Sequence, residues 1–362
     1  MEWEELDNLD DIDDVIEGLV DFEEDVTNLI PKRYLRDIDN PLEFYSEDEF
    51  RMRFRFSKDN VVNILHPLVE DLLKKTEQRG LPLPSIQKLI LALRVYATGN
   101  IQQVSGDLHG VSQATAGGIV HTISGLLAER TNDFVKLPAT EADCRKAMRW
   151  FYEIRGFPGV VACVDGTHIP IKNPGGVRPE IYRNRHGWFS LNVQVSAGAN
   201  MEIVDVSCRR GGSFHDATIF EASGLRRDFE EGRMHQGLLL GDNGYPCLPY
   251  LFTPLGNPQS MAETRYNRAH ISTRNVVERT LGVWKRRFRC LTKTLETSLN
   301  HSLSIILATT VLYNISRRSN DELPEDEFPW VQQEFQANAA PIGPHEQGHF
   351  IRQAFIRNDF NY

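Results

Sequence analysis

The pattern of apolar and polar residues changes once along the chain. From about residue 40 to 135, apolar residues recur at the i, i+3, i+4 and i+7 spacing of a helix face, most clearly at Ile86, Leu89, Ile90 and Leu93. From about 158 onward, short β-type runs alternate with helical segments. The pattern therefore predicts an all-α region over 32–150, followed by an α/β domain over 158–317.

A helix-turn-helix motif is expected inside the helical region. A segment at 104–108 is followed by a turn at His109 and Gly110, and Ser112 is a suitable N-cap for a helix through Leu126. Base recognition by this second helix stays open against a purely structural role, because its expected exposed positions include no Lys or Arg. Those positions are Gln113, Thr115, Gly117, Gly118, His121 and Thr122.

The second region predicts four strands and three helices. The strands are expected over 160–164, 189–195, 203–207 and 237–240, and the helices over 213–222, 273–290 and 301–317. Three strands in a meander, a helix, a fourth strand and then further helices form the order of the ribonuclease-H-like fold. We therefore expect an α/β fold with a ribonuclease-H-like mixed sheet and flanking helices.

Charge is concentrated at the ends of the chain. The net charge is −10, yet residues 1–31 hold 13 acidic residues and no Lys or Arg, so the remainder carries 40 basic against 37 acidic residues. We interpret 1–31 as an acidic tail that is disordered, or that forms a short helix which docks on a partner or masks a basic channel. Residues 318–362 are interpreted as an acidic linker with a short helix at 350–356.

Cysteine usage and hydropathy narrow the class of protein. The cysteines are odd in number and form no C-x-x-C pair, which predicts free buried thiols in a reducing compartment. They are Cys144, Cys163, Cys208, Cys247 and Cys290. No run of 18 apolar residues is present, so we expect no membrane span, and the acidic N-terminus does not resemble a signal peptide.

Two aspartates follow apolar strands and precede glycine. Asp165 comes directly after the 160–164 run, and Asp242 follows the 237–240 run by one residue. Each aspartate alone could simply cap its own turn. Because two carboxylates at one edge of a sheet repel each other without a cation, the pair favours a site for a hard metal ion.

Glu278 is the third acidic candidate and lies on a basic helix. Glu278, Gly282, Lys285 and Arg289 share one helix face, which suits a metal ligand with phosphate contacts beyond it. The alternative is a surface acid paired with Arg274 or Lys285. Three carboxylates without a His or Cys ligand set favour Mg²⁺ or Mn²⁺, and two such ions can promote in-line displacement at phosphorus.

Asp216 is a fourth candidate, with two equally supported roles. It either binds or orients the metal, or forms a helix capping box with Ser213. His168 and His215 are expected to be satisfied core histidines. Basic residues bracket the acids in the sequence and are expected to bind DNA phosphates. These residues are Arg183, Arg185, Arg209, Arg210, Arg274, Lys285, Arg286 and Arg289.

From about 35 to 315 the sequence resembles the PIF/Harbinger transposases and the Harbinger transposase-derived nucleases. The matching segments are VDGTHI at 164–169, YRNR at 182–185, SLNVQ at 190–194, HDATIF at 215–220, LGDNGY at 240–245, YNRAH at 266–270, VERT at 277–280 and WKRRFRCL at 284–291. The resemblance implies a DDE catalytic triad at Asp165, Asp242 and Glu278, with Asp216 also a metal ligand. It further implies a nuclear setting and a separate Myb/SANT-like DNA-binding partner. Family members often carry Ser-Arg where this chain has Gly117 and Gly118, which increases the importance of that partner.

Together these features predict a metal-dependent DNA endonuclease or transposase that works by a two-metal DDE mechanism, alone or followed by strand transfer. The alternative is a domesticated, non-catalytic scaffold that binds DNA or chromatin through a Myb/SANT-like partner. A ribonuclease of the same fold is a third hypothesis. A homo-oligomer and a cytoplasmic fraction are left open.

Overall fold

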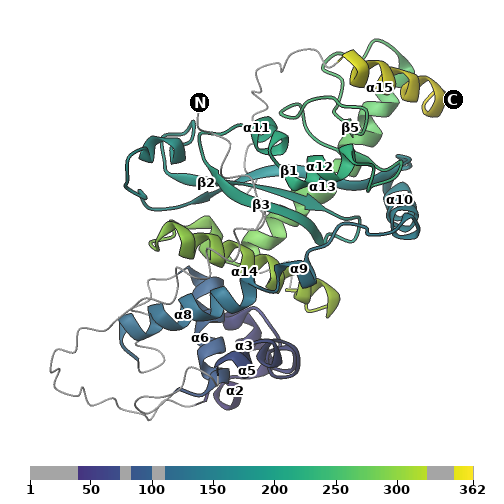
Figure 1. Ribbon diagram of the computed structural model, residues 1–362. Helices are drawn as coiled ribbons and strands as arrows, with labels where there is room; N and C mark the ends of the chain where they lie inside the picture. The colour runs from purple at the N-terminus through teal and green to yellow at the C-terminus, as the bar shows by residue number, and fades with distance from the viewer. Residues whose placement is uncertain (1–39, 74–82, 100–110, 324–345, 362) are drawn as a thin grey trace.

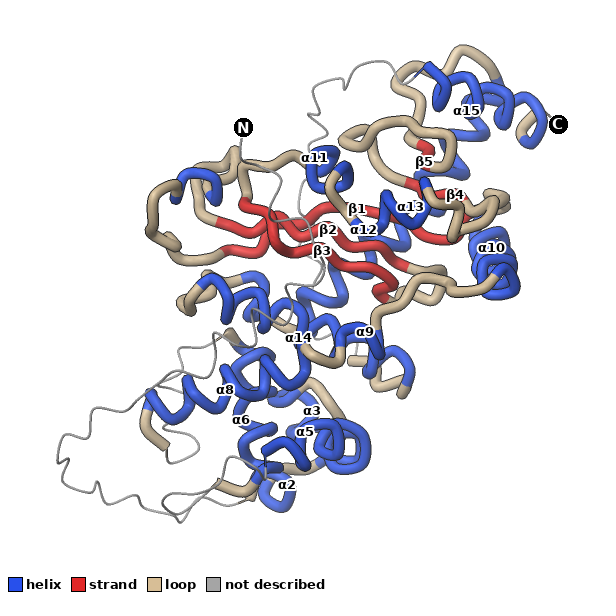
Figure 2. The backbone as a smooth tube through the Cα atoms, in the orientation of Figure 1, coloured by secondary structure: helices blue, strands red, loops and turns tan. Residues whose placement is uncertain are grey.

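The computed structural model describes residues 40–73, 83–99, 111–323 and 346–361. A five-stranded mixed sheet lies at its centre, in the order β3-β2-β1-β4-β5 (Figure 2). The strands are β1 (Val160–Pro170), β2 (Ser190–Ala197), β3 (Ile203–Gly211), β4 (Leu238–Leu240) and β5 (Leu251–Phe252). β1, β2 and β3 pair antiparallel, whereas β1, β4 and β5 pair parallel. A short turn joins β2 to β3, a longer connection that contains a 3₁₀ turn joins β1 to β2, and the helical crossover between β3 and β4 allows β4 to pair parallel to β1.

Helices cover both faces of this sheet. α13 (Met261–Arg287) packs on β1 and β2, and α14 (Leu299–Arg318) packs on β3. α11 (Asp216–Glu221) and α12 (Gly224–Glu230) bury Phe220, Leu225 and Phe229 in a separate apolar cluster together with β1 and β4. Two further helices belong to this part. α10 (Glu141–Arg155) packs on β1 and α13, and α15 (Glu346–Asp359) packs on α13 and β5. Two 3₁₀ turns, η4 (Pro179–Tyr182) and η5 (Arg289–Thr292), complete it. The α/β fold class with a ribonuclease-H-like sheet is confirmed.

The N-terminal region is helical, as predicted. Its elements are α2 (Pro41–Phe44), α3 (Glu47–Phe54), α4 (Lys58–Asn60), the π-helix η2 (Val61–Leu65), α5 (His66–Leu73), α6 (Ser85–Thr98), α8 (Gln113–Ala128) and α9 (Thr131–Phe134). α14 lies between these helices and the sheet and contacts both (Figure 1). No described helix has both the length and the apolar character needed to cross a membrane.

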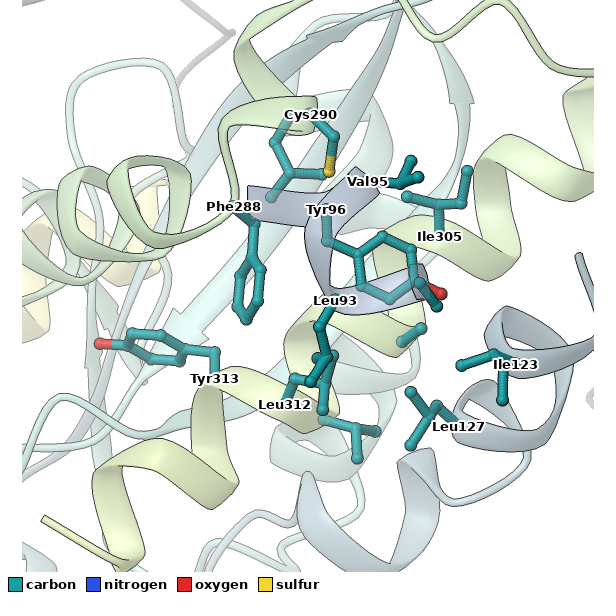
Figure 3. Close-up of a cluster of buried hydrophobic side chains, with 14 of the residues drawn as sticks. Leu93, Val95, Tyr96, Ile123, Leu127, Phe288, Cys290, Ile305, Leu312 and Tyr313 are labelled. Carbon is teal, nitrogen blue, oxygen red and sulfur yellow. The ribbon is translucent and has the colours of Figure 1, made fainter. Parts of the chain in front are cut away.

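One apolar core joins the helical region to the central sheet. Leu93 and Tyr96 of α6 and Ile123 of α8 pack with Phe288 at the end of α13 and Leu312 of α14 (Figure 3). α6 ends at Gly99, whose φ of +60° is left-handed, and a Cβ there would lie 2.9 Å from the Cα of Cys290. Glycine therefore both ends the helix and allows the close contact with η5.

Side-chain caps define several helix starts. Ser112 accepts a hydrogen bond from the Thr115 backbone at the start of α8, as the sequence predicted. α13 begins twelve residues earlier than expected, at a capping box formed by Ser260 and Glu263. β5 was not among the four strands expected from the sequence, since it holds only two residues. The first helix of the predicted helix-turn-helix falls at 104–108, outside the described residues, as does the tail at 1–31.

Part of the predicted acidic linker is buried. Asp321 is only 3% exposed and accepts hydrogen bonds from the Ser57 backbone at 2.8 Å and from Asn60 Nδ2 at 2.7 Å. Its carboxylate is also 3.5 Å from Arg51. Arg287, at the end of α13, donates to the backbone carbonyls of Arg55 and Asp321. These contacts tie the N-terminal helices to the C-terminal ends of α13 and α14.

All five cysteines are free and buried, as the sequence predicted. Four of them, Cys144, Cys163, Cys208 and Cys290, lie in three different apolar clusters and contribute packing.

Replacing Asp321 with Ala should destabilise the protein by about 3 kcal/mol, because buried donors and Arg51 lose their acceptor. Glu322→Ala is the matched control, since the neighbouring Glu322 side chain is 68% exposed and pairs with Arg317 at the surface. That control should change stability by less than about 0.5 kcal/mol. Denaturant unfolding measures both, and an equal effect of the two variants would contradict this role of Asp321.

Candidate active site

Asp165 lies at the centre of the site, on the middle strand of the sheet. The expectation that it ends its strand is wrong: β1 continues to Pro170, and Asp165 remains paired with Val195 of β2. The pairing of β1 with β4, however, stops at Cys163 and Leu240. Asp165 therefore lies just beyond the carboxyl end of its parallel neighbour.

The alternation of side chains along β1 sends its residues to two different faces. Cys163 contacts the backbone carbonyl of Thr273 on α13, and Asp165 points to the same helix. One Asp165 oxygen accepts a hydrogen bond from the Gly166 backbone at 2.9 Å, which is the turn-type contact considered as its ordinary role. The other oxygen is 3.3 Å from Arg274 Nη1. Asp165 thus has both a local and a long-range partner.

Asp242 follows β4 and accepts a hydrogen bond from the Gly244 backbone at 2.8 Å. Because β4 runs parallel to β1, this position brings its carboxylate next to Asp165, and the two repel each other. The two strands are neighbours in the sheet, as the sequence analysis assumed.

Glu278 reaches the site through Arg274. The two residues are one turn apart on α13, and Arg274 Nη2 forms an ion pair with Glu278 Oε1. The sequence analysis gave two possible roles for Glu278, a metal ligand or an acid paired with Arg274, and the structure contains that pair. The structure adds that the same guanidinium also contacts Asp165, so Arg274 links β1 to α13.

Asp216 approaches the site from the opposite face of β1. A Cβ built on Gly166 would lie 2.2 Å from Asp216 Oδ1, so only glycine lets this carboxylate come so close. Asn192 of β2 donates to the same oxygen at 2.9 Å. The predicted capping box is wrong: α11 starts at Asp216 without a side-chain cap, and Ser213 donates instead to the carbonyl of Ile181.

Burial and mutual repulsion dominate the electrostatics. Burial raises the pKa of Asp165 to about 8; Arg274 opposes this shift, whereas Asp242, Asp216 and Glu278 add to it. Burial also raises the pKa of Asp216, against the hydrogen bond from Asn192. The Arg274 guanidinium loses solvation by burial, but Asp165, Glu278 and Asp242 outweigh that loss and raise its pKa. Four carboxylates therefore share one electrostatic environment.

The residues of this environment suit a hard cation. Its donors are carboxylate oxygens, the ligands preferred by Mg²⁺ and Mn²⁺. The hydroxyl of Tyr245 and Oδ1 of Asn192 are buried without a hydrogen-bond partner among the described residues. Burial raises the pKa of Tyr245, and Asp216, Asp165 and Asp242 add to that shift, so its hydroxyl faces the same acids. Within the described ranges, however, no three potential ligands converge closely enough to hold an ion, and Arg274 lies between two of them.

His168 of β1 and Lys285 of α13 contact each other through a hydrogen bond. The ring of His168 contacts Ser190 Oγ at 3.0 Å through Nδ1, and burial lowers its pKa to about 4. Lys285 is 8% exposed and donates to the His168 carbonyl at 2.9 Å; burial lowers its pKa to about 8. Lys285 therefore supports β1 and is not presented to a phosphate. His215 is exposed, so the expectation of a core histidine is wrong for it.

The other predicted phosphate contacts divide between surface and interior. Arg183, Arg185, Arg209 and Arg289 are exposed, and Arg210 and Arg286 are partly buried. Arg183 pairs with Glu180 and contacts the Phe189 ring. Arg185 acts electrostatically on both His168 and Asp216, so it lies close to the acids.

The sequence did not assign roles to Asn192 and Tyr245, and it suggested Arg274 as a phosphate contact or a partner of Glu278 but not as a partner of Asp165. The i, i+4 spacing of Arg274 and Glu278 predicted that these two residues form an ion pair. No local signal predicts that Asn192 orients Asp216, because these residues are brought together by the packing of α11 on β2.

Comparison with known proteins agrees with this geometry. Residues 164–314 match the sequence profile of the DDE superfamily endonucleases. The chain is 35% identical to the protein named "Putative nuclease HARBI1" of Rattus norvegicus over 74% of its own length and 78% of the relative. The Homo sapiens protein of the same name is 34% identical over the same shares. "Protein ALP1-like" of Arabidopsis thaliana is 26% identical over 71% of this chain and 66% of the relative. No solved structure matches the chain significantly.

The pKa of Asp165 predicts how metal-free stability depends on pH. Because burial raises the pKa of Asp165 to about 8, ionisation of this group increasingly favours the unfolded chain as pH rises from about 4 to about 8, so this group costs stability over that range. Asp165→Asn removes that cost, and its melting temperature relative to the parent should therefore increase with pH. Thermal unfolding in EDTA across this range measures the difference.

Asp133→Asn is the control for this experiment, because the Asp133 side chain is 59% exposed. It reports any effect of replacing an acid by an amide that does not depend on burial. A constant difference for Asp165→Asn would mean that Asp165 is already ionised in the folded protein.

Proposed function

The chain belongs to the PIF/Harbinger family of DDE superfamily endonucleases, and on that premise we propose that it is a divalent-metal-dependent nuclease that cleaves DNA phosphodiester bonds, alone or followed by strand transfer. The observation that carries the proposal is that Arg274 bridges Asp165 and Glu278, with Asp242 acting on Asp165 from the carboxyl end of β4 and Asp216 against Gly166. The proposed catalytic residues are Asp165, Asp242 and Glu278, and Asp216 is a proposed fourth ligand.

These acids would hold Mg²⁺ or Mn²⁺. When bound, a pair of such ions can activate a water or a 3′-hydroxyl and stabilise the leaving oxygen of an in-line displacement. The protein's own residues prepare the site: Asn192 orients Asp216, Gly166 leaves room for it, and the Gly244 backbone holds one oxygen of Asp242. Burial of Asp165 strengthens its interaction with any cation.

The proposed substrate is DNA, bound through phosphates by exposed basic residues beside the acids. Arg185 is central to this proposal because it acts on both His168 and Asp216. Contacts of this kind supply affinity and little sequence preference. A DNA substrate also supports a nuclear location.

Sequence recognition is proposed to come from a Myb/SANT-like partner. α8, the expected recognition helix, carries no Arg or Lys. It also packs along α14, so one of its faces is already occupied. A base-reading helix normally presents polar and basic side chains at its start. The composition and packing of α8 thus favour a separate reader of DNA ends.

Asp165→Asn, Asp242→Asn and Glu278→Gln should each reduce DNA nicking by more than about 100-fold, because loss of a ligand exceeds the 10–100-fold cost of losing a residue that only orients one. The measurement is cleavage of transposon-end DNA in Mg²⁺ or Mn²⁺ with the partner supplied. Asp133→Asn, an exposed acid far along the chain, should retain activity.

Equal residual activity in the parent and the three variants would reject the nuclease proposal. In that case, rescue of a cellular phenotype by Asp242→Asn would support the non-catalytic scaffold. Preferential cleavage of an RNA duplex in a substrate panel would instead support a ribonuclease of the same fold.

Two basic residues should respond differently to removal. Arg185→Ala should weaken DNA binding across sequences and reduce the slope of log K against log salt by about 0.9, because one phosphate contact is lost. Lys285→Ala should lower the melting temperature and leave that slope unchanged, since Lys285 is buried against His168. Salt titrations by fluorescence anisotropy distinguish the two, and a reversed pattern would contradict both assignments.

A further inference from the structure

Arg274 occupies a position that a cation shared by Asp165 and Glu278 would need. Its two terminal nitrogens contact Asp165 Oδ2 and Glu278 Oε1, one oxygen from the strand and one from the helix. A guanidinium is a planar fork of fixed geometry, so it can neutralise two carboxylates at once. The same two oxygens face each other across the gap between β1 and α13.

The charge balance of the site explains why a cation is held there. Asp165 experiences repulsion from Asp242, Asp216 and Glu278, and the positive charge of Arg274 opposes it. Without a positive charge, this buried cluster would be costly to the fold. Arg274 therefore stabilises a set of acids whose arrangement is otherwise unfavourable.

Exposure increases from the interior toward the helix. The Asp165 side chain is 4% exposed, that of Arg274 is 14% and that of Glu278 is 27%. An ion arriving from solvent meets Glu278 first, then Arg274, and Asp165 last. It cannot take the oxygens of both acids while the guanidinium remains between them.

We propose that Arg274 is a positioning residue that takes the place of the divalent cation between Asp165 and Glu278 in the metal-free protein and releases both carboxylates when metal binds. The inference rests on the proposed nuclease function, because it concerns the same site. It goes further in assigning to this chain an internal competitor for its own metal. The apparent metal affinity is then reduced by the fraction of molecules in which Arg274 remains bound.

The test is Mg²⁺ binding by isothermal titration calorimetry on the full chain at pH 8.5, where proton competition is reduced. Arg274→Gln should bind Mg²⁺ about tenfold more tightly than the parent, because no guanidinium has to leave. Arg274→Lys should lie between the two, since an ammonium is a point charge that cannot span both carboxylates equally. Arg279→Gln is the matched control: it removes the same charge from an exposed position next to Glu278.

A second readout is thermal unfolding in EDTA and in Mg²⁺. Arg274→Gln should melt a few degrees below the parent in EDTA and gain more than the parent does on addition of Mg²⁺. Arg279→Gln should match the parent in both conditions. Because Arg274→Lys keeps a positive charge, it supplies the affinity comparison even where Arg274→Gln folds poorly.

The possible outcomes distinguish a failure of this inference from a failure of the proposed nuclease function. Equal or weaker Mg²⁺ binding by Arg274→Gln and Arg274→Lys, with binding by the parent that depends on Asp165, overturns the competition and leaves the nuclease site in place. Failure of the parent to bind Mg²⁺ at all counts against the proposed function itself. Tighter binding by Arg279→Gln to the same extent would mean a general charge effect and also overturn the inference.

Discussion

The repulsion among four neighbouring carboxylates, of which Asp165 is buried and the others are partly buried, is the constraint around which the nuclease domain is organised. Asp165 is held in the sheet by β-pairing, Asp242 by the end of β4, Asp216 by Asn192, and Glu278 by a helix. Such a cluster is unfavourable in an apolar interior unless positive charge accompanies it. Arg274 supplies that charge in the structure, and a metal ion is the proposed alternative. The fold thus maintains a cluster of acids that is unfavourable alone and that a positive charge stabilises.

α13 connects this cluster to the rest of the molecule. Its first turns pack on β5 and α15, its middle carries Arg274 and Glu278, and its end places Trp284 and Phe288 in the core shared with the N-terminal helices. Arg287 then donates to carbonyls of the N-terminal region and of Asp321. The position of Glu278 relative to β1 therefore depends on packing at both ends of one long helix. This continuity makes the helical region a structural support of the nuclease site.

The basic residues of the chain serve two separate purposes. Those at the surface, such as Arg185, place positive charge beside the acids, and DNA phosphates are their proposed partners. Those in the interior, such as Lys285 and Arg287, donate to backbone carbonyls and hold elements together. The sequence shows both groups as one basic stretch, because charge patterning along a chain does not reveal which positions packing will bury.

The sequence by itself determined the fold class, the family and the acidic residues worth considering, because strand periodicity and family motifs are local properties. It also indicated the Arg274–Glu278 pair from helical spacing. Only the tertiary structure decided that β1 continues past Asp165, that Asp321 is buried, and that Asp216 approaches over Gly166 rather than capping α11. Each of these depends on contacts between segments distant in sequence. The same reason applies to the contact between Arg274 and Asp165. These residues are 109 positions apart in the sequence, and only folding brings them together.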